Sequence, residues 1–174
     1  PHASPFIAEA ARPLFRQSRP GLWTLPLPYN GHTYDLYYTE TGEPHLISLE
    51  NLPSTTLTAL GSHLNTDQRD IFPHGINLNH VRLINSTTIH VTTYERGVNR
   101  ITPACGTGST SSAVLCHRLH TVTTPTIQVQ TAGGTLYIDH DADHNRSILK
   151  GPATLCPTPR HVVPPDQATP NPKP

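Results

Sequence analysis

The sequence predicts an α/β (α+β) domain, and two kinds of residue periodicity support this prediction. Apolar residues alternate with polar ones in 87–95, where Ile89 and Val91 stand two positions apart, as in a strand with one buried face. Leucines spaced by three and four residues after Ser54 indicate an amphipathic helix. A run of small and apolar residues at 106–119 predicts a second helix, which begins at a glycine-rich turn.

Several further segments have the alternation or the composition of strands. Asn85-Ser86 is a turn signal between two of them, and Ala132-Gly133-Gly134 is a hairpin signal between two others. Strands joined by such short turns pair antiparallel. The predicted strand segments are 33–39, 46–49, 72–81, 87–95, 126–130 and 135–139.

The two predicted helices have different sequence character. In the first, we assign the leucine stripe to core packing, and we expect Ser54 to cap the helix N-terminus. In the second, the middle turns carry little polar surface, as expected of a helix wrapped by a sheet. Cys116 lies about three turns beyond Cys105, so it is expected to be a small core residue that cannot share a site with Cys105.

Composition and charge exclude several classes of function. The chain has 174 residues, with 34% hydrophobic residues and 12 acidic against 12 basic residues. It therefore has the size of one domain and no excess of positive charge for nucleic acid or an anionic membrane. No apolar run approaches the ~20 residues of a membrane helix, and no signal-like leader opens the chain, so a cytoplasmic location is expected. The three cysteines have no paired spacing, which favours reduced thiols.

The two ends of the chain differ from its middle. Residues 1–30 are rich in proline and are expected to be irregular or extended. Residues 157–174 are rich in Pro, Thr, Gln and Asn and are expected to form a disordered tail. The chain begins with Pro1 and contains no methionine, so we expect it to be a piece of a longer gene product.

The candidate for chemistry is Cys105, because it stands at the entrance of the second predicted helix. The first N–H groups of a helix have no internal partner and carry the positive end of the helix dipole. A thiolate there would be stabilised by about 0.3–1 kcal/mol, and Gly106 and Gly108 would let a small anion approach the same N–H groups. The alternative is a buried cysteine ahead of an ordinary helix.

A longer pattern around Cys105 resembles a known family. Tyr94-Glu95-Arg96-Gly97, then Thr102, then Ala104-Cys105-Gly106-Thr107-Gly108 resembles the second active-site motif of the diaminopimelate epimerases. Proline racemases carry a related Cys-Gly-Thr-Gly but lack the Glu-Arg-Gly ahead of it. Gly42-Glu43-Pro44-His45, the segment around Asn77, and Gly151-Pro152-Ala153 match further family segments in the same order.

The resemblance implies a fold and a division of the chain. Family members have two pseudo-symmetric domains, each a curved, mostly antiparallel sheet wrapped around a central helix, with the active site in the cleft between them. Residues 31–156 would be the C-terminal domain, and residues 1–30 the crossover from a missing N-terminal domain.

The resemblance also assigns roles to residues. Each domain of these enzymes supplies one cysteine, and Cys105 would be one member of this acid–base pair. The N–H groups of Gly106 and Thr107 would hold the reacting α-carboxylate. Glu95 and Arg96 would bind the amino and carboxylate groups at the distal end of the substrate, although such a neighbouring pair is also typical of a surface salt bridge.

Three further positions bear on substrate binding. Asn77 matches the family asparagine that binds the far end of the substrate. His45 matches the family turn and would support the site, although a turn histidine without that role is an equal alternative. Glu43 stands where the family has an asparagine that contacts substrate, and a carboxylate cannot donate a hydrogen bond as an amide does.

The resemblance implies an isomerase that converts LL-diaminopimelate to meso-diaminopimelate, in lysine and peptidoglycan precursor biosynthesis, without pyridoxal phosphate or metal. The partners would be a small amino-acid substrate and the missing N-terminal domain with its second cysteine, so the chain alone is expected to be inactive; a homodimer is also considered. Two alternatives stay open. One is a racemase of another amino acid, which Glu43 and Arg100 favour, and the other is a non-catalytic binding or assembly domain.

Two groups of residues are of metal-binding types but lack the spacing of a metal site. The segment 139–145 is rich in Asp and His, yet it lacks the glycine and the spaced glutamate of a calcium loop, so we expect a solvated turn. His117 and His120 lie one helical turn apart without a recognisable third ligand. No metal is therefore expected.

Overall fold

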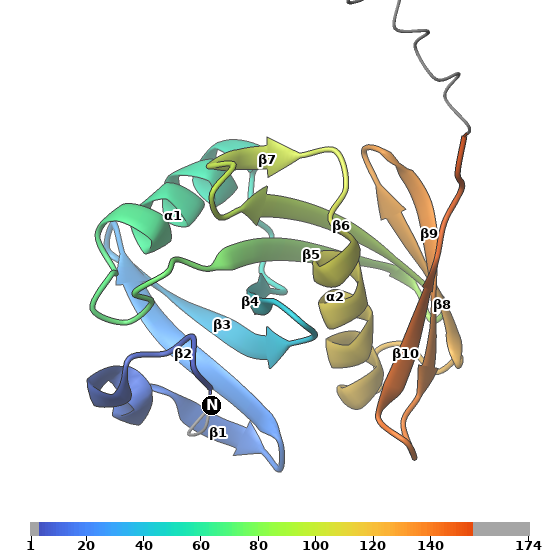
Figure 1. The fold of residues 1–174 in the computed structure, drawn as a ribbon, viewed down its shortest axis with the longest axis horizontal. Helices are drawn as coiled ribbons and strands as arrows, with labels where there is room; N and C mark the ends of the chain where they lie inside the picture. The colour runs from blue at the N-terminus through green and yellow to red at the C-terminus, as the bar shows by residue number, and fades with distance from the viewer. Residues whose placement is uncertain (1–3, 155–174) are drawn as a thin grey trace, which may run out of the picture.

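A computed structural model describes residues 4–154, which form a ten-stranded sheet and the helices that pack on it (Figure 1). Neighbouring strands follow the order β1-β2-β3-β4-β5-β6-β8-β9-β10, and β7 pairs with β6 outside this path. The strands are β1 (Arg16–Arg19), β2 (Leu22–Tyr29), β3 (His32–Glu40), β4 (Pro44–Ser48), β5 (Asn77–Asn85), β6 (Thr88–Glu95), β7 (Arg100–Thr102), β8 (Thr126–Thr131), β9 (Gly134–Asp141) and β10 (Arg146–Lys150).

Most pairings in the sheet are antiparallel, and the two parallel pairs mark the helical connections. β4 pairs parallel with β5, and β6 pairs parallel with β8. The chain between β4 and β5 contains helix α1 (Ser54–Thr66), and the chain between β6 and β8 contains helix α2 (Gly106–Arg118). Parallel neighbours need such crossovers because a tight turn cannot join them.

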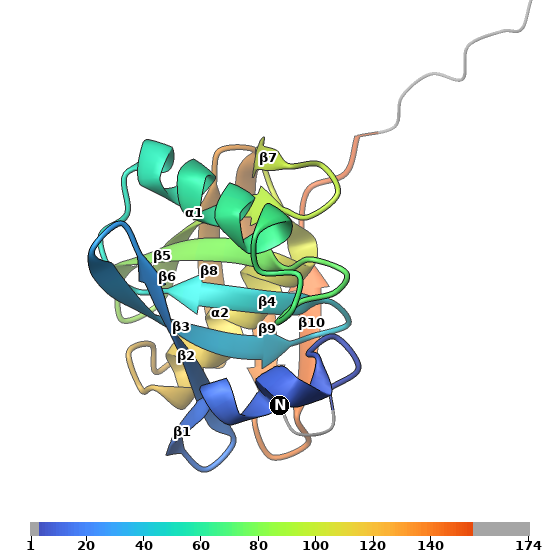
Figure 2. The same ribbon diagram turned by 90° about the vertical axis from the view of Figure 1, so that its left-hand side faces the viewer.

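The sheet separates the two helices. Helix α2 lies in the hollow of the curved sheet, where it contacts strands β3 to β6 and β8 to β10 (Figure 1). Helix α1 lies on the other face, against β5, β6 and β7, and Figure 2 shows it in front of the strands with α2 behind them. The prediction of a mostly antiparallel sheet wrapped around a central helix is therefore confirmed.

Two hydrophobic cores fill the two faces, and strand alternation sorts the residues between them. On β4, Leu46 packs into the core under α1, whereas Ile47 packs into the core around α2. On β6, Tyr94 joins the first core and Val91 the second. The leucine stripe of α1 lies in the first core, as predicted. Each face of the sheet thus has a defined set of positions, which decides where polar residues can form a site.

Three details differ from the sequence-based expectations. The segment before Gly31, expected to be irregular or extended, contains the 3-10 helix η1 (Glu9–Leu14) as well as the extended strands β1 and β2. Strand β2 keeps its pairing with β3 because its prolines alternate with buried leucines. Pro53 rather than Ser54 occupies the N-cap of α1, with no side-chain capping bond. The segment 98–104, which lies outside the predicted strands, contains the short strand β7.

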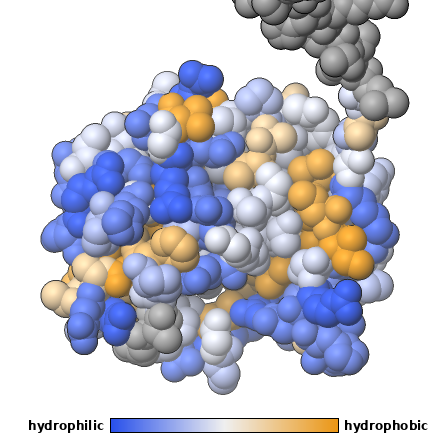
Figure 3. Space-filling view, in the orientation of Figure 1, coloured by the Kyte–Doolittle hydropathy of each residue, from blue (hydrophilic) through white to orange (hydrophobic). Residues whose placement is uncertain are grey.

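The surface is mixed, with one apolar area near the C-terminal strands. Figure 3 shows this area over the part of the molecule where β10 runs in Figure 1. Ile148 and Leu149 of β10 are each about half exposed. Among residues 4–154, no helix has the length and apolar character to cross a bilayer.

Candidate active site

Cys105 is the N-cap residue of α2, as the glycine-rich turn predicts. Its Sγ accepts a hydrogen bond from the backbone N–H of Gly108 at 3.4 Å, and the Thr107 hydroxyl lies 3.5 Å from the same sulfur. The side chain is neither fully buried nor fully exposed. The N–H groups of Gly106 and Thr107 belong to the first helical turn and have no acceptor within the helix. The sulfur therefore lies beside donors that stabilise negative charge.

The strands facing α2 supply polar side chains to this helix end. His45 on β4, Asn79 on β5 and Thr93 on β6 occupy the same face as the neighbouring core residues of the α2 side, because side chains two positions apart share a face. His45 and Asn79 are each 0% exposed and Thr93 is 3% exposed. Buried polar groups require partners, and these three find them in one another and in α2.

The amide of Asn79 has one orientation that satisfies all its neighbours. Its Nδ2 donates to the Leu46 carbonyl at 3.2 Å and to His45 Nδ1 at 2.9 Å, and its Oδ1 accepts from the Thr93 hydroxyl at 2.8 Å. A flipped amide would place oxygen against the Leu46 carbonyl, which has no proton to donate. The Leu46 carbonyl thus fixes the amide, the Thr93 hydroxyl donates to its oxygen, and the amide N–H leaves His45 Nδ1 without a proton.

His45 is consequently a neutral imidazole that carries its proton on Nε2. Burial and the nearby positive charge of Arg96 lower the pKa of His45 from 6.5 to about 3. Nε2 lies 3.0 Å from the Thr107 hydroxyl and donates to its oxygen. The Thr107 hydroxyl proton is then free to point to Cys105 Sγ. A chain of hydrogen bonds runs from Asn79 through His45 and Thr107 to the cysteine.

Gly108 allows this close packing between α2 and β5. A Cβ atom at this position would lie 2.5 Å from Asn79 Oδ1, 3.0 Å from Thr93 Oγ1 and 3.3 Å from Cys105 Sγ. Gly106, two residues earlier, lies on a different side of the helix. A Cβ atom at Gly106 would meet only the Leu149 side chain, at 2.9 Å. Gly108 therefore leaves room for the polar network, whereas Gly106 faces the apolar area on β10.

The turn before β4 is attached to the same helix end. Thr41 donates its hydroxyl proton to the Thr107 carbonyl at 3.2 Å, and its oxygen lies 2.6 Å from Ser111 Oγ. Its backbone N–H bonds the Glu43 carbonyl at 3.3 Å, which closes the turn. The turn that carries Glu43 is therefore held against the first turns of α2.

Arg96 forms a charged corner at the end of β6, together with Glu43. Its guanidinium pairs with the Glu43 carboxylate, and its Nη1 donates to the carbonyls of His74 and Gly75 at 3.4 Å each. The guanidinium carbon also lies 5.5 Å from the centre of the Phe6 ring, a cation–π distance. The chain itself therefore supplies several partners to the group expected to bind a substrate carboxylate.

Asn77 and Glu95 also have partners within the chain. Asn77 Nδ2 donates to the Pro44 carbonyl at 3.2 Å, and its Oδ1 accepts from the Arg96 backbone N–H at 3.0 Å. Its amide thus joins the turn before β4 to the turn after β6. Glu95 accepts a hydrogen bond from the Thr102 hydroxyl of β7, which explains the position of Thr102 in the sequence pattern.

The structure brings the residues singled out in the sequence into two adjoining groups. Cys105, Gly106, Thr107 and His45 meet at the N-terminus of α2. Asn77, Glu43 and Arg96 meet at the corner, with Glu95 next in the chain. Sequence reasoning missed Asn79, Thr93 and Thr41. The signal for Asn79 is its position two residues after Asn77, where one buried strand face carries two amides.

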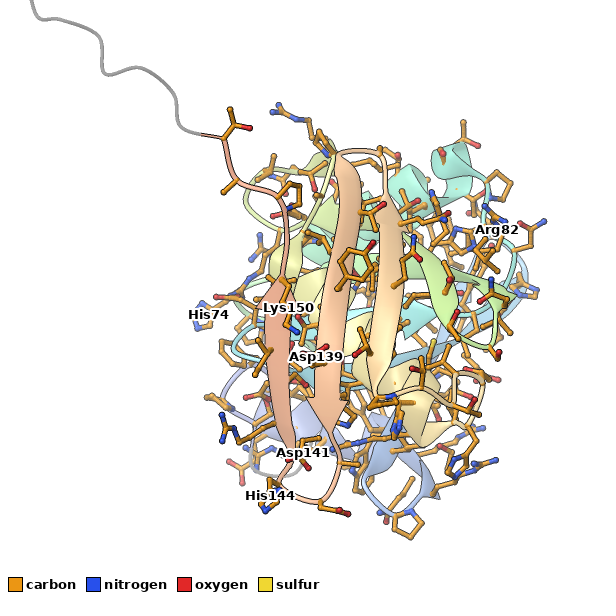
Figure 4. All side chains as sticks on the ribbon, turned by 90° about the vertical axis from the view of Figure 1, so that its right-hand side faces the viewer. His74, Arg82, Asp139, Asp141, His144 and Lys150 are labelled. Atoms are coloured by element: carbon orange, nitrogen blue, oxygen red, sulfur yellow. The ribbon has the colours of Figure 1, made fainter. Side chains whose placement is uncertain are left out.

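Other Cys, Asp and His residues considered in the sequence lie in the core or form surface contacts. Cys116 is 2% exposed in the core around α2, and burial raises the pKa of its thiol to about 11. Figure 4 shows Asp139 beside Lys150 across β9 and β10, and Asp141 beside His144 at the hairpin end, where each acid has its own ion-pair partner. Among residues 4–154, no three His, Cys, Asp or Glu side chains are grouped to hold a metal ion.

A comparison with known families covers the part of the chain that contains these residues. The family model described as diaminopimelate epimerase matches residues 37–156, which include both groups of site residues. The chain belongs to the diaminopimelate epimerase family. It is 37% identical over 129 residues to the diaminopimelate epimerase of Methanothrix thermoacetophila, covering 72% of this chain and 43% of that protein.

Other members of the diaminopimelate epimerase family show the same relation. The enzyme of Chlorobaculum tepidum is 30% identical over 122 residues, covering 69% of this chain and 47% of its own length. That of Thioalkalivibrio sulfidiphilus is 30% identical over 156 residues, covering 88% of this chain and 51% of its own length. The chain thus spans about half the length of these curated relatives.

Proposed function

We propose that this chain is the C-terminal half of an isomerase that inverts the α-carbon of an amino acid, and that Cys105 is one of its two acid–base groups. The observation that carries the proposal is the position of Cys105 Sγ, which caps α2 beside the Gly108 N–H and the Thr107 hydroxyl. General acid–base catalysis of this kind contributes about 10²–10⁴-fold in rate. Diaminopimelate, named for the relatives, is the first substrate to test.

The proposed reaction moves one proton on each face of the α-carbon. The Cys105 thiolate removes the α-proton, so that a C–H bond breaks, an S–H bond forms, and the electron pair delocalises into the α-carboxylate. The N–H groups of Gly106 and Thr107 hold that carboxylate as its charge grows. A second thiol, on the opposite face, then delivers its proton to carbon and completes the inversion without a cofactor.

His45 and Asn79 have a supporting role in this proposal. Their hydrogen bonds leave the Thr107 hydroxyl free to donate to the Cys105 sulfur. Donation to a thiolate stabilises it relative to the thiol. Because His45 is buried and neutral, it adds no positive charge that would bind the substrate carboxylate away from the helix N-terminus.

The second acid–base group has no candidate among the described residues. Cys116 lies in the core around α2, and burial keeps its thiol protonated; Cys156 lies outside the described residues. We therefore propose that a second domain supplies the opposing cysteine, in keeping with the half-length coverage of the relatives. Such a domain would cover the partly exposed N-terminus of α2 and the half-exposed Leu149.

Deuterium exchange tests the proposal. The gene product that carries this chain together with the residues encoded upstream is incubated with LL-diaminopimelate in D₂O, and label at the α-carbon is followed by mass spectrometry. We expect exchange by that protein and none by residues 1–174 alone. Rapid turnover by residues 1–174 would contradict the need for a second domain. A Cys105 of ordinary reactivity, with no binding of amino acids by the longer protein, would instead favour a non-catalytic binding domain.

A further inference from the structure

The charged corner at Arg96 differs from a free carboxylate-binding site. The Glu43 carboxylate pairs with the guanidinium, which also donates to two backbone carbonyls at 3.4 Å. The Arg96 side chain is 21% exposed and that of Glu43 is 45% exposed, so a bound substrate would meet Glu43 first. A ligand carboxylate would have to displace Glu43 from Arg96 and then lie beside it.

The charges of the corner favour a cation. Glu40, whose carboxylate accepts from the Tyr38 hydroxyl near Arg96, adds negative charge at the edge of the corner. At the corner itself, Arg96 contributes one positive charge, Glu43 and the neighbouring Glu95 each contribute one negative charge, and His45 is neutral. With a neutral residue at position 43 the three positions would balance, and the corner would suit a distal group that carries both an ammonium and a carboxylate. With Glu43 present, the corner has an excess of negative charge and suits a distal group that is positive only.

We propose that Glu43 sets the side-chain class of the substrate, and that this protein prefers α-amino acids whose side chain ends in an ammonium or a guanidinium group over diaminopimelate. This assignment rests on the proposed function, because it concerns the distal end of the same site. Glu43 and Glu95 receive the side-chain cation, and Arg96 stays paired with Glu43 and no longer selects a distal carboxylate. The α-carbon chemistry at Cys105 is unchanged.

The location of Glu43 supports an effect on selectivity rather than on chemistry. Its turn is fastened to α2 through the hydroxyl of Thr41, which contacts the Thr107 carbonyl and Ser111. The Asn77 amide ties the same turn to the Arg96 backbone. Glu43 therefore has a fixed place in the site, but its side chain makes no described contact with Cys105 or with the His45 network.

The test compares amino acids and one substitution in the gene product that carries this chain and its upstream residues. Exchange of the α-proton is measured with L-lysine, L-ornithine and LL-diaminopimelate, for the wild type and for Glu43→Asn. We expect wild-type kcat/KM to be at least about tenfold higher for a cationic amino acid than for diaminopimelate, which corresponds to about 1.4 kcal/mol. Glu43→Asn should reverse this ratio, chiefly through KM.

A matched control separates selectivity from loss of charge. Glu50 stands beyond the other end of β4, and its carboxylate also contacts a basic side chain at the surface, that of His32. Glu50→Gln removes the same charge away from the site and should leave the substrate ratio unchanged. A wild type that prefers diaminopimelate, or a ratio that Glu43→Asn does not move, would overturn the role of Glu43 while leaving the isomerase intact. Absence of exchange with all amino acids would overturn the proposed function and this assignment together.

Discussion

The two groups of site residues are built in opposite ways. At the N-terminus of α2, neutral side chains are buried and each hydrogen bond determines the next, from Asn79 to Cys105. At the corner, charged side chains are partly exposed, and Glu43 and Arg96 are joined by an ion pair. The first arrangement fixes geometry and protonation, as the proposed acid–base role of Cys105 requires. The ion pair of the second can exchange partners more readily, which suits the proposed role of the corner in selecting substrate side chains.

The difference has an energetic basis. A buried polar group that loses its partner costs about 1–3 kcal/mol, because water cannot replace the lost bond. An exposed ion pair contributes about 0–1 kcal/mol, because water and salt screen it. Substitutions in the two groups should therefore differ both in size and in kind, and four experiments, ordered by expected effect, probe this contrast.

The largest effect is expected for Cys105→Ala in the gene product with its upstream residues. Loss of the acid–base group should lower kcat by about 10²–10⁴-fold, and loss of the capping bond from the Gly108 N–H should lower the free energy of unfolding by about 1 kcal/mol. Cys116→Ala is the matched control, since it removes the buried thiol of the same helix. It should lower stability by about 1 kcal/mol through a small cavity and leave exchange intact. An equal loss of exchange in both variants would contradict an acid–base role for Cys105.

The second experiment uses pH to probe the buried network. His45 has a folded pKa of about 3 against 6.5 unfolded, so between these values the unfolded chain binds a proton that the folded chain does not. Stability from this residue is therefore complete above pH 6.5 and falls with decreasing pH by about 1.4 kcal/mol per unit. The loss between pH 6.5 and 5 should be about 2 kcal/mol.

The substitution His45→Gln isolates the contribution of His45 to the pH dependence of stability. The variant should be less stable than wild type at pH 7, yet its stability should depend less steeply on pH in urea titrations between pH 7 and 5. Burial also lowers the pKa of His80, His90 and His140, but these residues act in both proteins and cancel in the comparison. Parallel pH profiles would show that His45 is protonated in the folded state and would contradict the proton placement derived for Thr107.

The third experiment uses the two glycines at the start of α2. Gly108→Ala would place a methyl group 2.5 Å from Asn79 Oδ1, inside the buried network. We expect a loss of about 1–3 kcal/mol, despite the better helix propensity of alanine. Gly106→Ala would meet only the half-exposed Leu149, which can move aside, so its unfolding free energy should stay within about 1 kcal/mol of wild type. Urea unfolding measures the free energy of unfolding of both variants. Equal losses of stability would show that contact with the Asn79 network is not what requires glycine at position 108.

The sequence predicted the parts of the site that depend on local pattern. Cys105 at a helix N-cap follows from the glycines after it, and the strand leading to Glu95 follows from the alternation of Ile89 and Val91. Asn79 and Thr93 escaped prediction because their roles depend on which strands are neighbours, and the parallel pairing of β4 with β5 has no local signature. The ion pair of Glu43 with Arg96 spans 53 positions of sequence, and propensity carries no information on such a contact.

The smallest effect is expected for Glu43→Gln, measured as stability rather than selectivity. The substitution removes the ion pair but keeps an oxygen that can accept from Arg96, whose guanidinium retains the carbonyls of His74 and Gly75. The free energy of unfolding should fall by at most about 1 kcal/mol, and by less in 1 M salt, where screening acts within about 3 Å. Urea unfolding at low and high salt gives both values. A salt-independent loss above this range would mean that the corner, like the network at Cys105, is part of the structural framework and not an exchangeable selector.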